Sequence, residues 1–229
     1  AIVDRVTASL AGKRTAFAFD MPGNGESDNV IGTDNINVES YAEVIEHAID
    51  SLGLDAIDVY GMWGGGLIGL DLAIRRPHQV KHLCISSVLY HTAEERADLL
   101  ANYTAPIEID WYGGHLLRCW HFMRDQALFW PWYRRTREGI IWSEPWIEPE
   151  GIHARVVAML KAGDMYHHAY QAHFSYPTHE RLQEVGVPTL LCSPTWGGTI
   201  QHSEAAAKAA PQCKYAILPT AMEAWSKEL

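Results

Sequence analysis

The fold of this chain is decided by the stretch Ala56-Ile57-Asp58-Val59-Tyr60-Gly61-Met62-Trp63-Gly64-Gly65-Gly66-Leu67-Ile68-Gly69-Leu70-Asp71-Leu72-Ala73. A β-branched and aromatic run meets a cluster of glycines, and an apolar segment with helical spacing follows directly. This pattern predicts a strand, a sharp turn and a helix. A turn of the form Gly-x-nucleophile-x-Gly needs its two glycines because the strand and helix backbones pass too close for a Cβ. Gly61 and Gly65 stand at those two positions.

Trp63 occupies the position at which such a turn carries its nucleophile. An indole has no hydroxyl, thiol or carboxylate that could form a covalent intermediate. We expect its side chain to act as a plug in the space that a smaller nucleophile leaves open; the alternative is a platform on which a ligand stacks. Because a positive φ strains a bulky residue, we also expect the turn to have relaxed here.

Length and charge limit the classes of protein that the chain can belong to. Its 229 residues allow one large α/β domain, or one domain with an inserted lid. The balance of 18 basic against 28 acidic residues gives a net charge of −10, which argues against a nucleic-acid or anionic-membrane partner. No apolar run is long enough to span a bilayer. The four cysteines form no Cys-x-x-Cys pair, so a reducing, cytoplasmic setting is expected. No oligomeric state is indicated.

The order of patterns along the chain predicts an α/β fold with a mostly parallel sheet and helices on both faces. We expect helices over 1–12, 38–52 and 64–75, and buried strands over 15–19, 57–60 and 81–88. The chain begins inside the first helix, which suggests that something upstream is missing. The Pro- and Gly-rich loop 20–28 follows a strand, and ligands collect at the carboxyl ends of parallel strands. Asp20 is therefore predicted at the rim of a pocket.

The alternation stops after residue 88. Residues 89–186 are helical in pattern and rich in tryptophan, which predicts an inserted helical cap. The sheet resumes with a strand at 187–192, a helix at 203–210 and a last strand at 214–218. We therefore expect a core made of 1–88 and 187–229, with 89–186 as the cap.

Three features make the chain resemble the α/β-hydrolase superfamily over nearly its whole length. They are the Asp20-x-Pro-Gly-x-Gly-x-Ser27 loop, the Gly61-x-x-x-Gly65 turn, and the helical cap inserted before Val187-Pro188-Thr189-Leu190-Leu191. The resemblance implies the α/β-hydrolase fold and descent from a hydrolase of an ester or related small apolar substrate. No cofactor is expected.

The positions that carry the catalytic residues of that superfamily are empty in this sequence. The nucleophile position is Trp63. The loop 193–199, where the resemblance implies the acid, has no carboxylate, and residues 219–225, where it implies the histidine, have no imidazole. One oxyanion donor is retained as the Gly64 backbone N–H, whereas the resemblance implies a second one upstream of Ala1. The chain therefore resembles a truncated and catalytically degenerate member.

The cap and the glycine cluster suggest further sites. We predict a capped aromatic pocket lined by Asp20, Trp63, Trp120, Trp130, Trp132, Tyr133, His167 and Tyr170. Metal binding is not expected, because His167, His168 and His173 do not share one face of a helix. Close helix–strand packing explains Gly64-Gly65-Gly66 better than anion binding does. We expect Asp20, Asp164 and His202 to be the only titratable groups that the fold brings near the turn centred on Trp63, which is called the elbow below.

Three functions are compatible with these motifs. The leading hypothesis is a catalytically degenerate protein of hydrolase descent. The alternative is a non-catalytic protein that binds a small apolar ligand in the capped aromatic pocket. The third is an enzyme with an acid–base mechanism foreign to the superfamily, in which cap histidines act as general acid and base.

Overall fold

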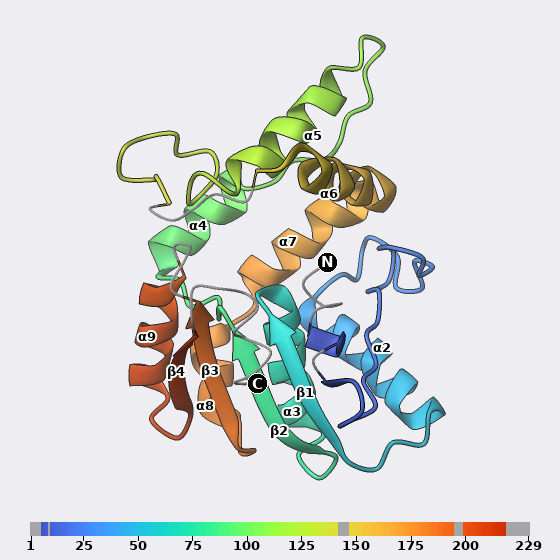
Figure 1. Cartoon of the computed structure of the whole chain (residues 1–229), viewed down its shortest axis with the longest axis vertical. Helices are drawn as coiled ribbons and strands as arrows, with labels where there is room; N and C mark the ends of the chain where they lie inside the picture. The colour runs from blue at the N-terminus through green and yellow to red at the C-terminus, as the bar shows by residue number, and fades with distance from the viewer. Residues whose placement is uncertain (1–5, 9, 142–146, 195–198, 219–229) are drawn as a thin grey trace.

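Four parallel strands form one sheet in the computed structural model, which describes residues 6–8, 10–141, 147–194 and 199–218. Their order is β1 (Ile57–Met62), β2 (Val80–Ser86), β3 (Thr189–Pro194) and β4 (Lys214–Leu218). The register pairs Tyr60 with Cys84, Cys84 with Leu190 and Leu190 with Lys214. Since all four strands run the same way, their carboxyl ends share one edge of the sheet (Figure 1).

Four helices pack around this sheet. They are α2 (Val38–Ser51), α3 (Gly64–Arg75), α8 (Thr178–Glu184) and α9 (Ile200–Ala209). Helix α3 contacts β1 and β2, α9 contacts β3 and β4, α8 contacts both α3 and α9, and α2 lies against α3. The core between them contains fully buried aliphatic side chains, among them Leu67, Leu70, Leu83, Ile85 and Leu191. The predicted parallel sheet with flanking helices is confirmed.

The helices between β2 and β3 form a second cluster. They are α4 (Ala93–Asn102), α5 (Gly114–Asp125), α6 (Pro149–Ala162) and α7 (Asp164–Ser175), and they pack around a core of Leu99, Phe122, Ile152, Met159 and Phe174. Within the described part of this segment, the only β pairing outside named strands is an isolated bridge between Phe129 and Ile140. Figure 1 shows these helices beyond the carboxyl edge of the sheet, with α7 running back toward it. No helix among the described residues is long and apolar enough to cross a membrane.

The prediction of a buried strand at 15–19 is wrong. These residues are not in a strand, and the side chains of Phe17 and Phe19 are 49% and 41% exposed. The segment starts beside the sheet, since Arg14 pairs with Asp58 of β1. Aromatic composition favours a strand only where a neighbouring strand supplies hydrogen bonds, and β1 pairs with β2 alone among the described strands. Of the predicted first helix, residues 6–8 and 10 are helical, and 1–5 and 9 lie outside the described residues.

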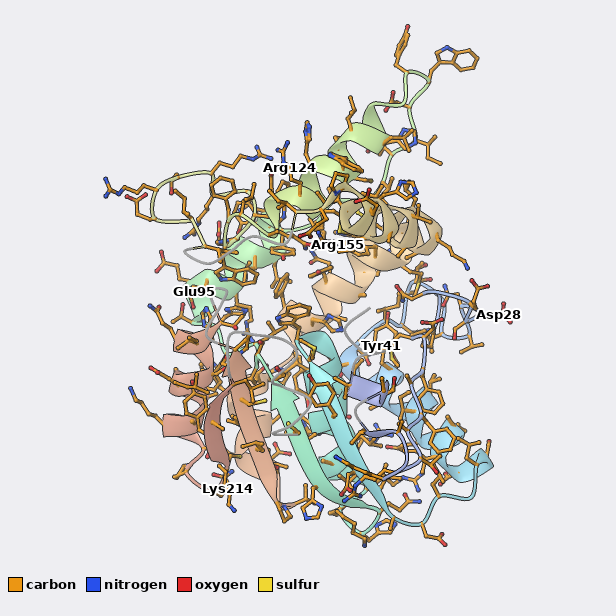
Figure 2. All side chains as sticks on the ribbon, viewed as in Figure 1. Asp28, Tyr41, Glu95, Arg124, Arg155 and Lys214 are labelled. Carbon is orange, nitrogen blue, oxygen red and sulfur yellow. The ribbon has the colours of Figure 1, made fainter. Side chains whose placement is uncertain are left out.

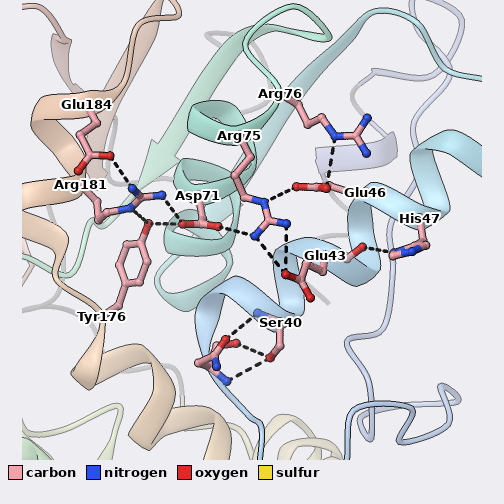
Figure 3. A network of polar contacts seen from close by, with 11 residues as sticks. Ser40, Glu43, Glu46, His47, Asp71, Arg75, Arg76, Tyr176, Arg181 and Glu184 are labelled. Carbon is pink, nitrogen blue, oxygen red and sulfur yellow. Dashed lines mark hydrogen bonds and ion pairs between the residues drawn. The ribbon is translucent and has the colours of Figure 1, made fainter.

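A buried carboxylate joins the helix that follows the elbow to the end of the cap segment. Asp71 of α3 is fully buried, and its Oδ1 accepts hydrogen bonds from Tyr176 Oη at 3.0 Å and from Arg181 Nη2 at 2.7 Å. Arg75 lies on its other side, with Nη1 3.9 Å from Oδ2 (Figure 3). Because a buried charge needs partners, this network fixes α8 and the end of α7 against α3.

Asp71→Ala is expected to lower the free energy of unfolding by about 3–5 kcal/mol, because it leaves the Arg181 guanidinium and the Tyr176 hydroxyl without their shared acceptor. Urea denaturation measures the change. The control is Asp50→Ala, which removes an exposed partner of Arg76 and is expected to change stability far less. Equal losses in the two variants would show that the buried network does not hold α8 to α3.

Candidate functional site

The sharp turn between β1 and α3 is retained with a tryptophan at its centre. Trp63 has φ 47° and ψ −122°, and it is the N-cap residue of α3. Its N–H donates to the Ser86 carbonyl at 3.1 Å, and its carbonyl accepts from the Gly66 N–H at 2.9 Å. A non-glycine residue in this conformation costs about 1–3 kcal/mol. The expectation that the turn had relaxed is therefore wrong.

The glycines around this turn are not equally necessary for it. A Cβ on Gly61 would lie 2.3 Å from the Gly65 carbonyl oxygen, and one on Gly66 would lie 2.5 Å from Ile85 Cγ2. A Cβ on Gly65 would meet nothing within 4 Å. The close approach was correctly predicted at Gly61, but Gly65 contributes its backbone and does not itself need to lack a side chain.

The Trp63 indole is 41% exposed. A side chain with that much exposed surface does not fill a closed space, so the expectation of a plug is wrong. The indole instead lies open at the carboxyl edge of the sheet, directly after β1.

His173 of α7 lies against the elbow. A Cβ on Gly64 would be 2.1 Å from Cε1 of this imidazole, so the ring covers the α-carbon of the residue after Trp63. The Nε2 atom of His173 is buried and has no hydrogen-bond partner in the described structure. Tyr41 of α2 lies next to it, with 6.4 Å between ring centroids. Helix α7 thus brings a titratable group from the cap segment to the position of the expected oxyanion donor.

Burial sets the charge of this group. Loss of hydration lowers the pKa of His173 to about 4, and it raises the pKa of Tyr41 to about 12. Both side chains are therefore neutral at pH 7. A neutral imidazole can donate or accept a proton, but the described residues supply no carboxylate that would orient it as in a catalytic triad.

A small cavity lies next to His173 under the cap. It is lined by Leu89, His91, Arg96, His173, Phe174, Tyr176, Thr178 and His179. None of these residues was among those predicted to line a pocket. Three of them are histidines from separate elements, which makes the cavity more polar than the aromatic pocket expected from the sequence.

His91 also belongs to a cluster with Glu95 and His202. One ligand atom from each of the three lies within 4.8 Å of the other two. Burial and, next, His202 lower the pKa of His91 to about 4. Burial raises the pKa of Glu95, but the hydrogen bond from the Thr92 backbone and the attraction of His202 outweigh it, so the net shift is downward. This is the group of described residues that can hold a metal ion.

Most of the predicted pocket residues between β2 and β3 pack against a buried hydrophobic cluster. Trp120, Trp130, Trp132, Tyr133 and Tyr170 lie against the cluster around Tyr103 and Phe122. His167 Nδ1 is 3.0 Å from Thr104 Oγ1. Trp130 alone of this set reaches the new cluster, stacking on His91 at 6.1 Å. That these aromatic side chains bind a ligand stays a prediction.

The groups expected near the elbow have other partners. Asp20 closes its own loop, since its Oδ2 accepts from the Glu26 N–H at 3.0 Å. Asp164 lies in the first turn of α7, and His202 Nδ1 contacts the Tyr90 carbonyl at 2.9 Å. Residues 195–198, within the loop expected to hold the acid, and 219–225, expected to hold the histidine, lie outside the described residues.

Sequence reasoning missed His91 and placed His173 only in a rejected metal set. His91 stands five residues after the last residue of β2, and His202 lies in the first turn of the helix after β3. Both follow carboxyl ends of neighbouring parallel strands, so the rule that ligands collect there was the available signal. His173 approaches Gly64 because of the direction in which α7 runs, and no local sequence pattern predicts that direction.

Comparisons with known proteins agree with this architecture. Residues 5–106 match a family model described as alpha/beta hydrolase fold. The solved structure of a thermophilic esterase from Thermogutta terrifontis superposes with a TM-score of 0.69 at 17% identity, covering 99% of this chain and 80% of that one.

Two curated proteins are similar in sequence. "Putative carbamate hydrolase RutD" of Azorhizobium caulinodans is 25% identical over 193 residues, which cover 81% of this chain and 64% of that protein. "2-hydroxy-6-oxo-2,4-heptadienoate hydrolase" of Pseudomonas putida is 35% identical over 80 residues, which cover 35% and 29%. The chain thus spans less than two thirds of the length of either relative.

Gly61→Ala and Gly65→Ala are expected to change stability in opposite directions. The first forces a methyl group against the Gly65 carbonyl and is expected to cost about 3 kcal/mol. The second adds a methyl group in open space at the start of α3 and is expected to raise stability by up to ~1 kcal/mol. Chemical denaturation of both variants tests the elbow geometry. A stable Gly61→Ala chain would contradict it.

His173 is expected to make the protein less stable at acid pH. Its pKa is about 4 when folded and about 6.5 in an unfolded chain, so the unfolded state binds more protons between these values and stability falls as pH falls through that range. The free energy of unfolding is expected to lose up to ~3 kcal/mol there. His173→Leu removes this part of the slope, whereas His153→Leu, an exposed histidine of α6, does not. Parallel curves for wild type and His173→Leu would refute the assignment.

Proposed function

We propose that this chain, which has the α/β-hydrolase fold, descends from a hydrolase of an ester or related small apolar substrate but does not itself hydrolyse through a covalent intermediate. One observation carries the proposal: Trp63 stands at the centre of a retained elbow, at φ 47°. The geometry that presents a nucleophile is kept, while the indole has no group that could attack a carbonyl carbon.

The names of the relatives support hydrolase descent. One is described as a carbamate hydrolase, another as a dienoate hydrolase and a third as an esterase. All three names describe hydrolytic enzymes. The aromatic composition of the cap favours an apolar substrate for the ancestor. Because the chain spans only part of the curated relatives, both the substrate class and the loss of activity are proposals.

The sequence and the position of His173 agree with a loss of covalent chemistry. The loop 193–199 contains no carboxylate, and residues 219–225 contain no histidine. His173 lies against Gly64, but burial keeps it neutral and its Nε2 has no partner in the described structure. An imidazole without an orienting partner is a poor general base for a nucleophile, and here the nucleophile itself is missing.

A second candidate function is non-catalytic binding of a small apolar ligand. The observation that favours it is the exposure of the Trp63 indole at the edge of the sheet where ligands collect. An exposed indole offers a flat surface for stacking. A saturable quenching of tryptophan fluorescence by p-nitroanisole that is lost in Trp63→Phe would support this candidate, and quenching that is equal in both chains would exclude it.

The proposed function is tested by assaying the 229-residue chain and its Trp63→Ser variant with p-nitrophenyl acetate and p-nitrophenyl butyrate. Both chains are expected to unfold cooperatively on heating and to release p-nitrophenol no faster than buffer does. The variant restores a hydroxyl at the elbow, but the acid and the base expected of the family have no residue at their positions.

Turnover by the wild-type chain would contradict the proposal. If that turnover were unchanged in Trp63→Ala and lost in His173→Leu, it would point instead to an acid–base mechanism that uses the cavity histidines. A serine esterase at the same concentration serves as the positive control.

A further inference from the structure

Three metal-ligating side chains from separate elements meet at the carboxyl edge of the sheet. His91 lies in the loop after β2, Glu95 in the first turn of α4 and His202 in the first turn of α9. One donor atom of each lies within 4.8 Å of the other two. We propose that His91, Glu95 and His202 bind a divalent transition-metal ion of the zinc class.

His91 carries a buried ring nitrogen without a hydrogen-bond partner. Its side chain is 8% exposed, and its Nε2 is buried with no hydrogen-bond partner in the described structure. The ring meets that of His202 edge to face, with 4.5 Å between centroids. A buried ring nitrogen without a partner is costly, and coordination of a cation by its lone pair would remove that cost.

His202 is held in the tautomer that metal binding requires. Its Nδ1 is 2.9 Å from the Tyr90 carbonyl oxygen, which can only accept, so Nδ1 carries the proton. The lone pair of the neutral ring is then on Nε2. A backbone carbonyl that fixes the other ring nitrogen is the usual support for a metal-binding histidine.

Glu95 supplies the negative charge that the two neutral imidazoles lack. Its Oε2 accepts from the Thr92 N–H at 2.8 Å within the capping box of α4, which fixes the carboxylate. The carboxylate has further lone pairs for a ligand. Figure 2 shows Glu95 at the end of α4 nearest to α9, the helix that carries His202.

Contacts from His202 and His179 fix the backbone at residues 90 and 91. Besides the contact of His202 with the Tyr90 carbonyl, His179 Nε2 lies 2.9 Å from the His91 carbonyl oxygen. The His179 ring also stacks on Tyr90, with 3.7 Å between centroids and 2° between planes. These contacts fix residues 90 and 91 before any ion binds, which reduces the entropy lost on binding.

The donor set selects the kind of ion. Two imidazole nitrogens and one carboxylate oxygen suit Zn²⁺, Co²⁺ or Ni²⁺, whereas Mg²⁺ and Ca²⁺ prefer oxygen ligands alone. Zn–N bonds of about 2.0 Å place tetrahedral donors roughly 3.3 Å apart, so small side-chain rotations would close the set around an ion. Three protein ligands leave a fourth position for water.

The test measures zinc binding to the whole chain after dialysis against EDTA. Equilibrium dialysis with ZnCl₂, followed by elemental analysis, is expected to show one tightly bound ion per chain, and ZnCl₂ but not MgCl₂ is expected to raise the Tm. His202→Ala and Glu95→Gln are expected to weaken zinc binding by about 100-fold. Glu95→Gln keeps a side-chain oxygen for the Thr92 N–H, so α4 retains its cap.

His153→Ala, which removes an exposed histidine far from the cluster in sequence, is the matched control and is expected to bind zinc as the wild type does. Cooperative unfolding of each metal-free variant shows that it is folded. In the wild type, Co²⁺ is expected to give the visible d–d bands of a four-coordinate ion, and the bands are expected to be lost in His202→Ala. Absence of bound zinc in the wild type, or equal affinity in wild type, His202→Ala and Glu95→Gln, would overturn the proposal.

Discussion

The close approach of β1 to α3 is the constraint on which the rest of the site depends. A side chain on Gly61 would collide with the Gly65 carbonyl, because the backbones of β1 and α3 are in close contact there. Trp63 is the residue between them, and it is held at φ 47° by hydrogen bonds to the neighbouring strand and to its own helix. The strain of about 1–3 kcal/mol persists because the surrounding packing over-determines the turn. The indole is directed to the carboxyl edge of the sheet for the same reason.

The segment between β2 and β3 brings histidine side chains to this edge of the sheet. Helix α7 carries His173 onto Gly64, and the loop after β2 carries His91 toward His202 of α9. Burial keeps the imidazoles of His91 and His173 neutral, which favours coordination or hydrogen bonding over ion pairing. Tertiary packing therefore gathers these histidines, and His173 among them lies against Gly64, the residue after Trp63.

Local patterns predicted much of the fold. The stripe of apolar residues gave a helix at 38–52, against Val38–Ser51 in the structure, and the last strand at 214–218 is as expected. The prediction of a strand at 15–19 failed because composition does not supply a pairing strand. The expectation that Trp63 is a plug failed because a local pattern does not show how much of a side chain tertiary packing covers. The aromatic residues of the cap were predicted to line a pocket because a sequence does not show that Trp132 packs on Phe122. His91, Glu95 and His202 are separated by up to 111 residues in the chain, so only the fold brings them together.

The elbow with tryptophan at its centre is proposed to form no covalent intermediate. Intact-mass spectrometry after incubation with a fluorophosphonate, which phosphonylates activated serine hydroxyls, tests it most directly. The wild-type chain is expected to keep its unmodified mass, while a serine esterase treated in parallel gains one adduct. A stoichiometric adduct on any serine of this chain would show that a working nucleophile exists elsewhere, and it would contradict the claim.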